Sequence, residues 1–112
     1  MKGDSVLSSQ MPRCKITVLK RTINHDLINE YLEKPQEHPG PCEYLTEGQE
    51  FIVNQVWTQP EGLCPWAWAD IRQQIVTVLG GGRFPGMKDS GVAIAGCSDW
   101  FRPVIFKVER LD

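Results

Sequence analysis

The chain has 112 residues, of which 41% are hydrophobic, so it has room for one domain with a core and no more. Its formal net charge is −2, and its basic residues are spread along the chain without a long run. This excludes the clustered basic surface that nucleic-acid binding needs. No apolar stretch is long enough to cross a bilayer, which excludes a membrane-spanning helix.

Residues 1–13 are polar and lack the apolar segment of a secretory signal. They are predicted to form a flexible N-terminal tail, followed by a single domain over residues 14–112. The four cysteines would allow two disulfides, but without an export signal we expect free thiols in a reducing cytoplasm. No C-x-x-C pair occurs, so neither a zinc knuckle nor a thioredoxin-type motif is present. The cysteines are Cys14, Cys42, Cys64 and Cys97.

The first half of the chain predicts a strand, a short helix and a loop. Residues 14–20 alternate between apolar and polar side chains, which indicates a strand with one buried face. Asn24 can cap a helix that runs to residue 32. Residues 33–49 are rich in proline and glutamate and predict a long acidic loop, which carries His38 and Cys42. The apolar stripe of the short helix comprises Leu27, Ile28, Tyr31 and Leu32.

The second half predicts three strands and a longer helix. Residues 50–57 alternate and form the second strand. In residues 65–79, Trp68, Ile71 and Ile75 recur at helical spacing, Pro65 suits the first helical position, and a triple glycine follows the last turn. Residues 92–97 and 102–110 form two further strands, and the short connection between them predicts an antiparallel hairpin.

This order of elements predicts an α+β fold, because separate strands and helices follow one another without a regular βαβ repeat. We expect two layers. The first is a mixed, mostly antiparallel sheet of about four strands, and the second consists of two helices on one face of that sheet.

Cys64 directly precedes Pro65, so it is the predicted N-terminal cap of the longer helix. Unpaired N–H groups and the positive end of the helix dipole favour a thiolate there. Cys64 is therefore predicted to be the most readily ionised thiol and a catalytic nucleophile. Trp66 and Trp68 follow it and are predicted to contact a ligand. The alternative is that Cys64 is a small buried residue beside packed aromatic side chains.

Residues 97–103 place a thiol, a carboxylate and a guanidinium within one turn. Cys97 and Asp99 are predicted catalytic residues, with Asp99 as acid, base or orienting carboxylate. Arg102 is predicted to bind an anionic ligand through its bidentate donors. The alternative is that Asp99 stabilises the turn with a hydrogen bond and pairs with Arg102.

Three cysteines, Cys42, Cys64 and Cys97, lie at the edges of loops or the ends of elements, and such positions can converge in a folded domain. Together with His38 they would complete a tetrahedral site for a metal ion such as zinc. Their spacing in the sequence carries no metal signature, so the cofactor is left open.

Several short motifs stand out along the chain. They are Gly40-Pro41-Cys42, Glu47-Gly48-Gln49-Glu50-Phe51, residues 60–68 with the pattern P-E-G-x-C-x-W-A-W, the glycines 81–82, and residues 97–106 with the pattern C-x-D-x-x-R-P-V-x-F. Together they resemble a family of small bacterial and archaeal proteins of similar length without an assigned function. The resemblance spans residues 14–111 and implies a fold unit and candidate positions rather than a reaction. Gly96 and Trp100 stand where that family has a second cysteine and a turn glycine, so chemistry that needs adjacent thiols is not implied.

The sequence thus predicts a small cytoplasmic protein whose cysteine-centred polar site binds a small anionic or soft ligand, or a metal ion, with catalysis left open. The alternative is a non-catalytic interaction module that self-associates into a homo-oligomer through a tryptophan-rich surface. Exposure of Trp57, Trp66 or Trp100 would favour the module, and a pocket with two or more inward thiols would favour the site. Neither hypothesis involves nucleic acid or a membrane.

Overall fold

The computed structural model describes residues 12–54 and 58–111. Nearly all of the predicted tail, and the last residues of the predicted second strand, lie outside these ranges. Arg13 is described, and its carbonyl accepts a hydrogen bond from the Leu111 N–H at 2.9 Å. In chain order the elements are β1 (Cys14–Arg21), α2 (His25–Tyr31), the 3-10 helix η1 (Pro35–Glu37), β2 (Glu50–Val53), α3 (Pro65–Asp70), α4 (Arg72–Leu79), β3 (Val92–Gly96) and β4 (Val104–Arg110).

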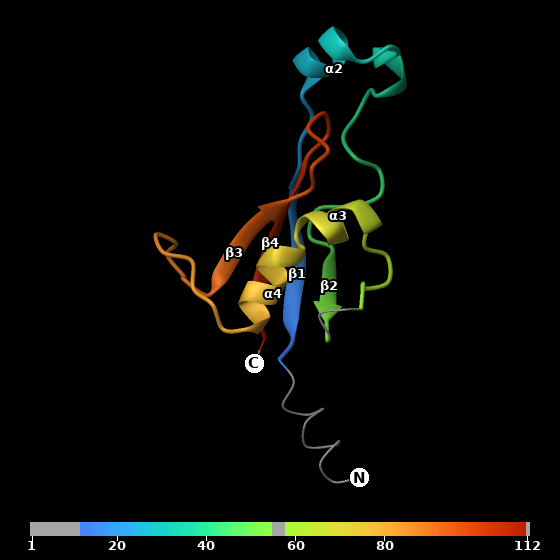
Figure 1. Ribbon diagram of the computed structural model, residues 1–112. Coiled ribbons are helices and arrows are strands. Elements are labelled where there is room, and N and C mark those ends of the chain that lie inside the picture. The colour runs from blue at the N-terminus through green and yellow to red at the C-terminus, as the bar shows by residue number, and fades with distance from the viewer. Residues whose placement is uncertain (1–11, 55–57, 112) are drawn as a thin grey trace.

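The four strands form one sheet in the order β2-β1-β4-β3 (Figure 1). Every neighbouring pair is antiparallel, so the α+β class is confirmed and the expected parallel component of the sheet is wrong. The predicted hairpin is β3 and β4, in which Ala95 lies opposite Phe106. The first and last strands of the chain lie side by side at the centre, which places β2 and β3 at the edges.

One face of the sheet carries the hydrophobic core, as the alternating patterns predicted. In β4, Val104, Phe106 and Val108 are buried while the residues between them are partly exposed. Helix α4 packs on this face against β4, β3 and β1. Its buried residues Ile75 and Val78 meet the strand side chains there. The core therefore lies between the sheet and the α3–α4 pair.

The helix predicted over residues 65–79 is broken at Ile71. Ile71 has φ −98° and ψ 6°, outside helical values, and it separates α3 from α4. Its N–H still bonds to the Ala67 carbonyl, and its own carbonyl accepts from the Ile75 N–H. Ile71 is fully buried, and the change of direction lets α3 bury Trp68 while α4 buries Ile75. No glycine or proline marks the break, so the apolar periodicity alone suggested one helix.

Helix α2 does not cover the sheet. It lies beyond one end of β1 and β4, at the top of Figure 1. Of its predicted apolar stripe only Ile28 is buried, and Tyr31 is 71% exposed. The expectation that this helix shares one face of the sheet with the longer helix is therefore wrong, and α3 and α4, the two parts of the predicted longer helix, lie on that face. Asn24 is the N-cap residue of α2, yet its side chain donates to the Trp100 carbonyl at 2.6 Å instead of capping the helix.

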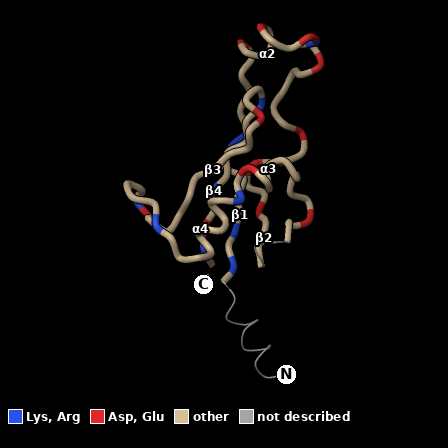
Figure 2. Tube along the Cα trace, viewed as in Figure 1, with Lys and Arg blue, Asp and Glu red and all other residues tan. Residues whose placement is uncertain are grey.

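The acidic loop after α2 keeps its predicted character. Figure 2 shows acidic residues concentrated around α2 and this loop, whereas basic residues lie along β1. The loop contains η1 and is anchored to the core by Leu45, which is buried. Among the described residues, no helix has both the length and the apolar character needed to cross a membrane.

Candidate functional site

Most of the predicted site residues meet in one pocket of about 250 Å³, which we call the thiol pocket. Its wall comes from three separate parts of the chain: the acidic loop, the start of α3, and the connection between β3 and β4. The lining residues are Cys42, Tyr44, Leu45, Cys64, Trp66, Ala67, Cys97, Asp99, Arg102 and Val104. Three thiols, a carboxylate, a guanidinium and two aromatic rings therefore surround one small cavity.

Cys97 occupies the end of the β3–β4 hairpin. Its N–H donates to the Val104 carbonyl at 3.1 Å, which continues the ladder by one step. The Val104 N–H returns a hydrogen bond to the Cys97 Sγ at 3.3 Å. The sulfur is thus fixed by the backbone on the strand that forms one side of the thiol pocket.

Asp99 and Arg102 form the turn that closes the hairpin. The Asp99 Oδ1 accepts hydrogen bonds from the N–H groups of Phe101 and Arg102, each at 3.1 Å. Asp99 Oδ2 lies 4.0 Å from the Arg102 Nε, at the limit of an ion pair. The turn-stabilising alternative for Asp99 is therefore what the geometry shows. Within the described part of the chain, the Arg102 guanidinium makes this one long contact and no side-chain hydrogen bond.

Trp66 is held at the pocket by residues that the sequence did not single out. Its indole Nε1 donates to the Ser98 Oγ at 2.7 Å. The Ser98 N–H in turn donates to the Asp70 Oδ2 at 2.6 Å. Asp70 is the last residue of α3, four positions after Trp66, so these two bonds tie the hairpin connection to that helix. A serine next to Cys97 gave no signal of this role in the sequence.

The wall that carries Cys42 is held by an ion pair that was also not predicted. The Arg21 Nε donates to the Glu47 Oε1 at 2.9 Å, and the Arg21 Nη1 donates to the Cys42 carbonyl at 2.8 Å. The hydrogen bond from its own backbone N–H holds the pKa of the Glu47 carboxyl below its usual range. Desolvation opposes this effect, and the Arg21 contacts reinforce it. Arg21 ends β1, so it connects the sheet to the acidic loop.

The cysteines differ in their surroundings, and all four are free thiols. Cys14 is fully buried in β1, and burial raises the pKa of its thiol to about 11. Cys42, Cys64 and Cys97 are partly buried and pack against the edge of the core. Cys64 is the N-cap residue of α3, as predicted, but its side chain makes no capping hydrogen bond. The structure therefore shows no special contact between the Cys64 sulfur and the helix.

Two predicted site residues lie elsewhere. Trp68 is buried in the core and does not line the thiol pocket, because it faces the sheet from α3. The Arg72 guanidinium lies over its ring at 5.0 Å from the centroid. His38 follows η1 in the acidic loop and does not reach the pocket.

The predicted metal site is not formed. The described residues contain no group of three or more histidine, cysteine, aspartate or glutamate side chains that could hold a metal ion. All four predicted ligands, Cys42, Cys64, Cys97 and His38, are among the described residues. His38, the fourth predicted ligand, does not line the pocket that the three cysteines share.

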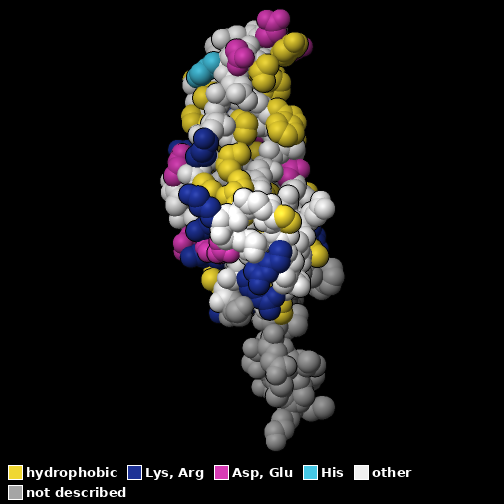
Figure 3. Space-filling view, turned by 90° about the vertical axis from the view of Figure 1, so that its left-hand side faces the viewer, with side chains coloured by type: hydrophobic (Ala, Val, Ile, Leu, Met, Phe, Trp, Pro, Cys, Tyr) yellow, Lys and Arg dark blue, Asp and Glu magenta, His cyan; other side chains and the backbone are white. Residues whose placement is uncertain are grey.

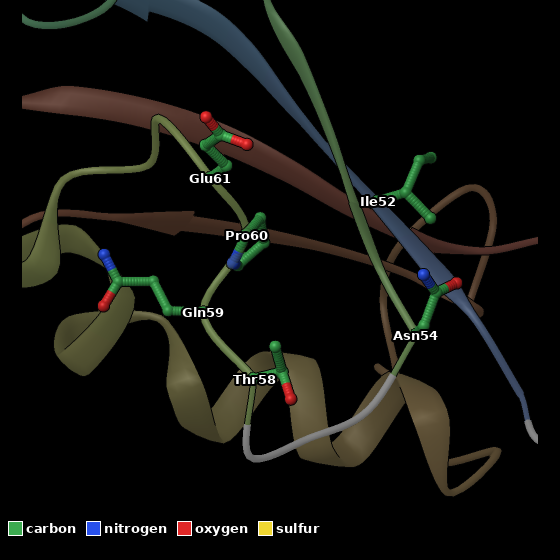
Figure 4. A pocket seen from close by; sticks show the side chains of 6 residues that line it. All are labelled: Ile52, Asn54, Thr58, Gln59, Pro60 and Glu61. Atoms are coloured by element: carbon green, nitrogen blue, oxygen red, sulfur yellow. The ribbon is translucent and has the colours of Figure 1, made fainter.

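A larger and more open pocket of about 520 Å³ lies beside the end of β2 (Figure 4). It is lined by Ile52, Asn54, Thr58, Gln59, Pro60 and Glu61. The Gln59 amide donates to the Leu63 carbonyl at 2.7 Å, which commits one of its polar groups to the local turn. Among the described residues that line it, Glu61 is the one with an ionisable side chain, so they offer less chemistry than the thiol pocket does.

Comparisons with protein-family models, with curated proteins and with solved structures found no match. The family resemblance of the short motifs stays a prediction.

Proposed function

We propose that the protein binds a small anionic organic molecule in the thiol pocket, and that it does so in a reducing cytoplasm. The presence of four free cysteines supports this compartment, because partly exposed thiols persist where glutathione and thioredoxin keep them reduced. The polar groups of the pocket are few and the remaining wall is apolar or sulfur-containing, as is common for small-molecule sites.

The state of Arg102 is the observation that carries this proposal. Its side chain is only 25% exposed, yet its guanidinium contacts Asp99 at 4.0 Å and no closer partner in the described chain. Backbone N–H groups already bond to the Asp99 carboxylate, so Asp99 is held by the turn rather than by Arg102. A partly buried guanidinium gains most from a bidentate anionic partner, and such a partner would enter from the pocket.

Iodoacetate and iodoacetamide give a matched pair of probes for this charge preference. The two reagents are similar in size, and both alkylate a thiol by the same displacement. The sulfur forms a bond to carbon as iodide leaves, and the thiol proton passes to solvent. The ratio of their rate constants at Cys42, Cys64 and Cys97 therefore reports how the pocket treats a carboxylate.

Arg102→Gln is expected to lower the iodoacetate-to-iodoacetamide ratio about fivefold, the effect of one charge about 4 Å away in a water-like medium. Arg102→Lys keeps the charge and should keep most of the ratio. Arg83→Gln, which removes an exposed arginine outside the thiol pocket, is the matched control and should change nothing. An unchanged ratio in Arg102→Gln would show that the pocket does not recognise anions.

A second candidate is the interaction module, and the exposed aromatic residues favour it. Trp66 is 64% exposed and Trp100 is 69% exposed. Figure 3 shows hydrophobic side chains gathered over the upper part of one face of the molecule, toward α2. A homo-oligomer that covers such a surface would remove apolar area from water. Trp57, the third residue named for this test, lies outside the described residues.

Sedimentation velocity over a range of concentrations separates the two candidates. Trp100→Ser should abolish any self-association through the exposed Trp100 side chain, while leaving the alkylation ratio unchanged, because Trp100 does not line the thiol pocket. If the wild-type protein stays monomeric at high concentration, the hypothesis of a self-associating interaction module is wrong.

A further inference from the structure

The thiol pocket has an exposed aromatic ring whose orientation is fixed. Trp66 is 64% exposed, but its Nε1 is bound to the Ser98 Oγ. Ser98 is itself fixed by the Asp70 carboxylate. An exposed tryptophan without a partner would sample several rotamers, whereas this one lines the cavity with its indole N–H already bound, so it has less freedom to lose when a ligand binds. It therefore forms a preorganised aromatic part of the pocket wall.

The remaining wall is suited to a ring. Tyr44, which is 80% exposed, adds a second aromatic side chain from the acidic loop. Sulfur atoms make favourable contacts with aromatic rings, usually near the ring edge. Three cysteines, Cys42, Cys64 and Cys97, line the wall. A saturated ring would also be stabilised by removing its apolar surface from water, but it would make no aromatic stacking or sulfur–aromatic contacts.

The size of the cavity limits the ligand. Its volume of about 250 Å³ suits a single ring with a short acidic substituent. A fused ring system with a phosphate-bearing chain would extend beyond it. Arg102 lines the same cavity and supplies the donors for the acidic group.

We propose that the ligand class of the thiol pocket is a one-ring aromatic carboxylic acid, whose ring stacks on Trp66 and whose carboxylate binds Arg102. This inference rests on the proposed function and adds the ring specificity to it. Trp66 is a specificity-determining residue in this arrangement. Ser98 is a positioning residue, because it acts through the indole Nε1 and does not itself line the pocket.

Three probes test the ring and the charge separately: phenylacetate, its saturated analogue cyclohexylacetate, and the neutral phenylacetamide. Each is measured by the concentration that protects the pocket cysteines from iodoacetamide, read by mass spectrometry of the labelled peptides. Phenylacetate is expected to protect at concentrations roughly two- to tenfold lower than cyclohexylacetate, the range expected for aromatic stacking.

Trp66→Leu should bring phenylacetate and cyclohexylacetate to the same protecting concentration, and Trp66→Phe should keep part of the difference. Ser98→Ala keeps the backbone bond to Asp70 but frees the indole, so it should reduce the preference without abolishing it. Equal protection by the two acids in the wild type, or an unchanged preference in Trp66→Leu, would overturn the ring specificity.

The outcome for charge is independent of the outcome for the ring. If phenylacetamide protects as well as phenylacetate, the anion-binding function fails while a ring preference still stands. If phenylacetate is preferred over phenylacetamide but not over cyclohexylacetate, the function stands and the ring specificity fails.

Discussion

The backbone N–H of Val104 donates its hydrogen bond to the sulfur of Cys97, 3.3 Å away, at the point where the β3–β4 ladder ends. In a regular antiparallel pair this N–H would bond to the Cys97 carbonyl, because the Cys97 N–H already bonds to the Val104 carbonyl. The cysteine side chain thus replaces a backbone acceptor. Cys97 also lines the thiol pocket, so one residue serves both the hairpin and the site.

Removing that sulfur should destabilise the hairpin. Val104 is buried, so Cys97→Ala leaves its N–H without a partner and is expected to lower the free energy of unfolding by about 1–3 kcal/mol. Cys97→Ser keeps an acceptor at nearly the same place and should lose less. Urea unfolding of both variants measures the difference. Equal stability of the alanine and serine variants would mean that the sulfur does not act as an acceptor.

Ile75 lies at the centre of the α4 surface that faces the sheet. Ile75→Ala is expected to lower the free energy of unfolding by about 2–5 kcal/mol, because the side chain is fully buried and leaves a cavity. Val76→Ala, on the half-exposed side of the same helix, is the control and should change stability by less than about 0.5 kcal/mol. Similar losses of unfolding free energy in the two variants would show that Ile75 does not lie on the face of α4 that packs in the core.

Cys14 should resist alkylation while the protein is folded. Its thiol is buried and its pKa is raised to about 11, so the thiol stays protonated at pH 8. At the same pH, about a tenth or more of ordinary thiols are ionised. Intact mass after iodoacetamide treatment should show three labels on the folded protein and four in denaturant, and peptide mapping should place the first three on Cys42, Cys64 and Cys97. Rapid native labelling of Cys14 would show that β1 opens far more readily than its burial implies.

Glu47 should make the acidic loop sensitive to low pH. Its folded pKa lies below the ordinary value of 4.5, so the ionised group stabilises the fold above that value. This contribution disappears as the pH falls through the folded pKa and Glu47 becomes protonated. Glu47→Gln cannot titrate and should lose less stability than the wild type between about pH 5 and pH 3.

The effect of Glu47 is measured by urea unfolding of both proteins at about pH 5 and about pH 3. NMR exchange rates of the Gly48 amide give a local readout, because this amide bonds to the Val18 carbonyl next to the ion pair. Parallel pH dependence in the wild type and in Glu47→Gln would contradict a role for the Arg21–Glu47 contact. Glu30→Gln, an exposed glutamate of α2, is a suitable control.

Gly82 is a glycine for steric reasons. A Cβ at this position would lie 2.5 Å from the Thr77 Cγ2 and 3.1 Å from the Thr77 carbonyl oxygen. The Thr77 hydroxyl is bonded to the Gln73 carbonyl, which resists a change of rotamer. Gly82→Ala should lower the unfolding free energy by about 1–3 kcal/mol, as overpacking does. Gly40→Ala, where no atom lies within 4 Å of the added carbon, should cause no loss.

The sequence by itself determined the strands and the core face. Residues such as Val104, Phe106 and Val108 alternate with polar neighbours, and period-two alternation has one physical solution when one face is buried. Pro65 and Cys64 likewise mark the start of α3 correctly, because proline at the first helical position is a local effect. A sequence pattern predicts a structural feature correctly where the physical cause of that feature lies within a few residues.

The direction of each helix depended on contacts that the pattern does not contain. Ile71 breaks the predicted helix so that α3 and α4 can both bury their apolar sides against a twisted sheet. Trp68 fits the apolar spacing of a core residue and the position of a ligand contact equally well, and only packing against the sheet assigns it to the core. Helix α2 shows an apolar stripe, but it lies beyond the end of the sheet, where there is little for the stripe to pack against.

The thiol pocket shows the same division most clearly. The sequence identified Cys42, Cys64 and Cys97 by residue type and Arg102 by its charge, all from local arguments. Their convergence, and the failure of His38 to join them, followed from contacts between residues far apart in the chain. Arg21 and Glu47 are 26 positions apart, and Trp66 and Ser98 are 32 apart. Such pairings are set by the strand order and by hydrogen bonds that form only in the folded chain, so tertiary structure alone decided which candidate residues share a cavity.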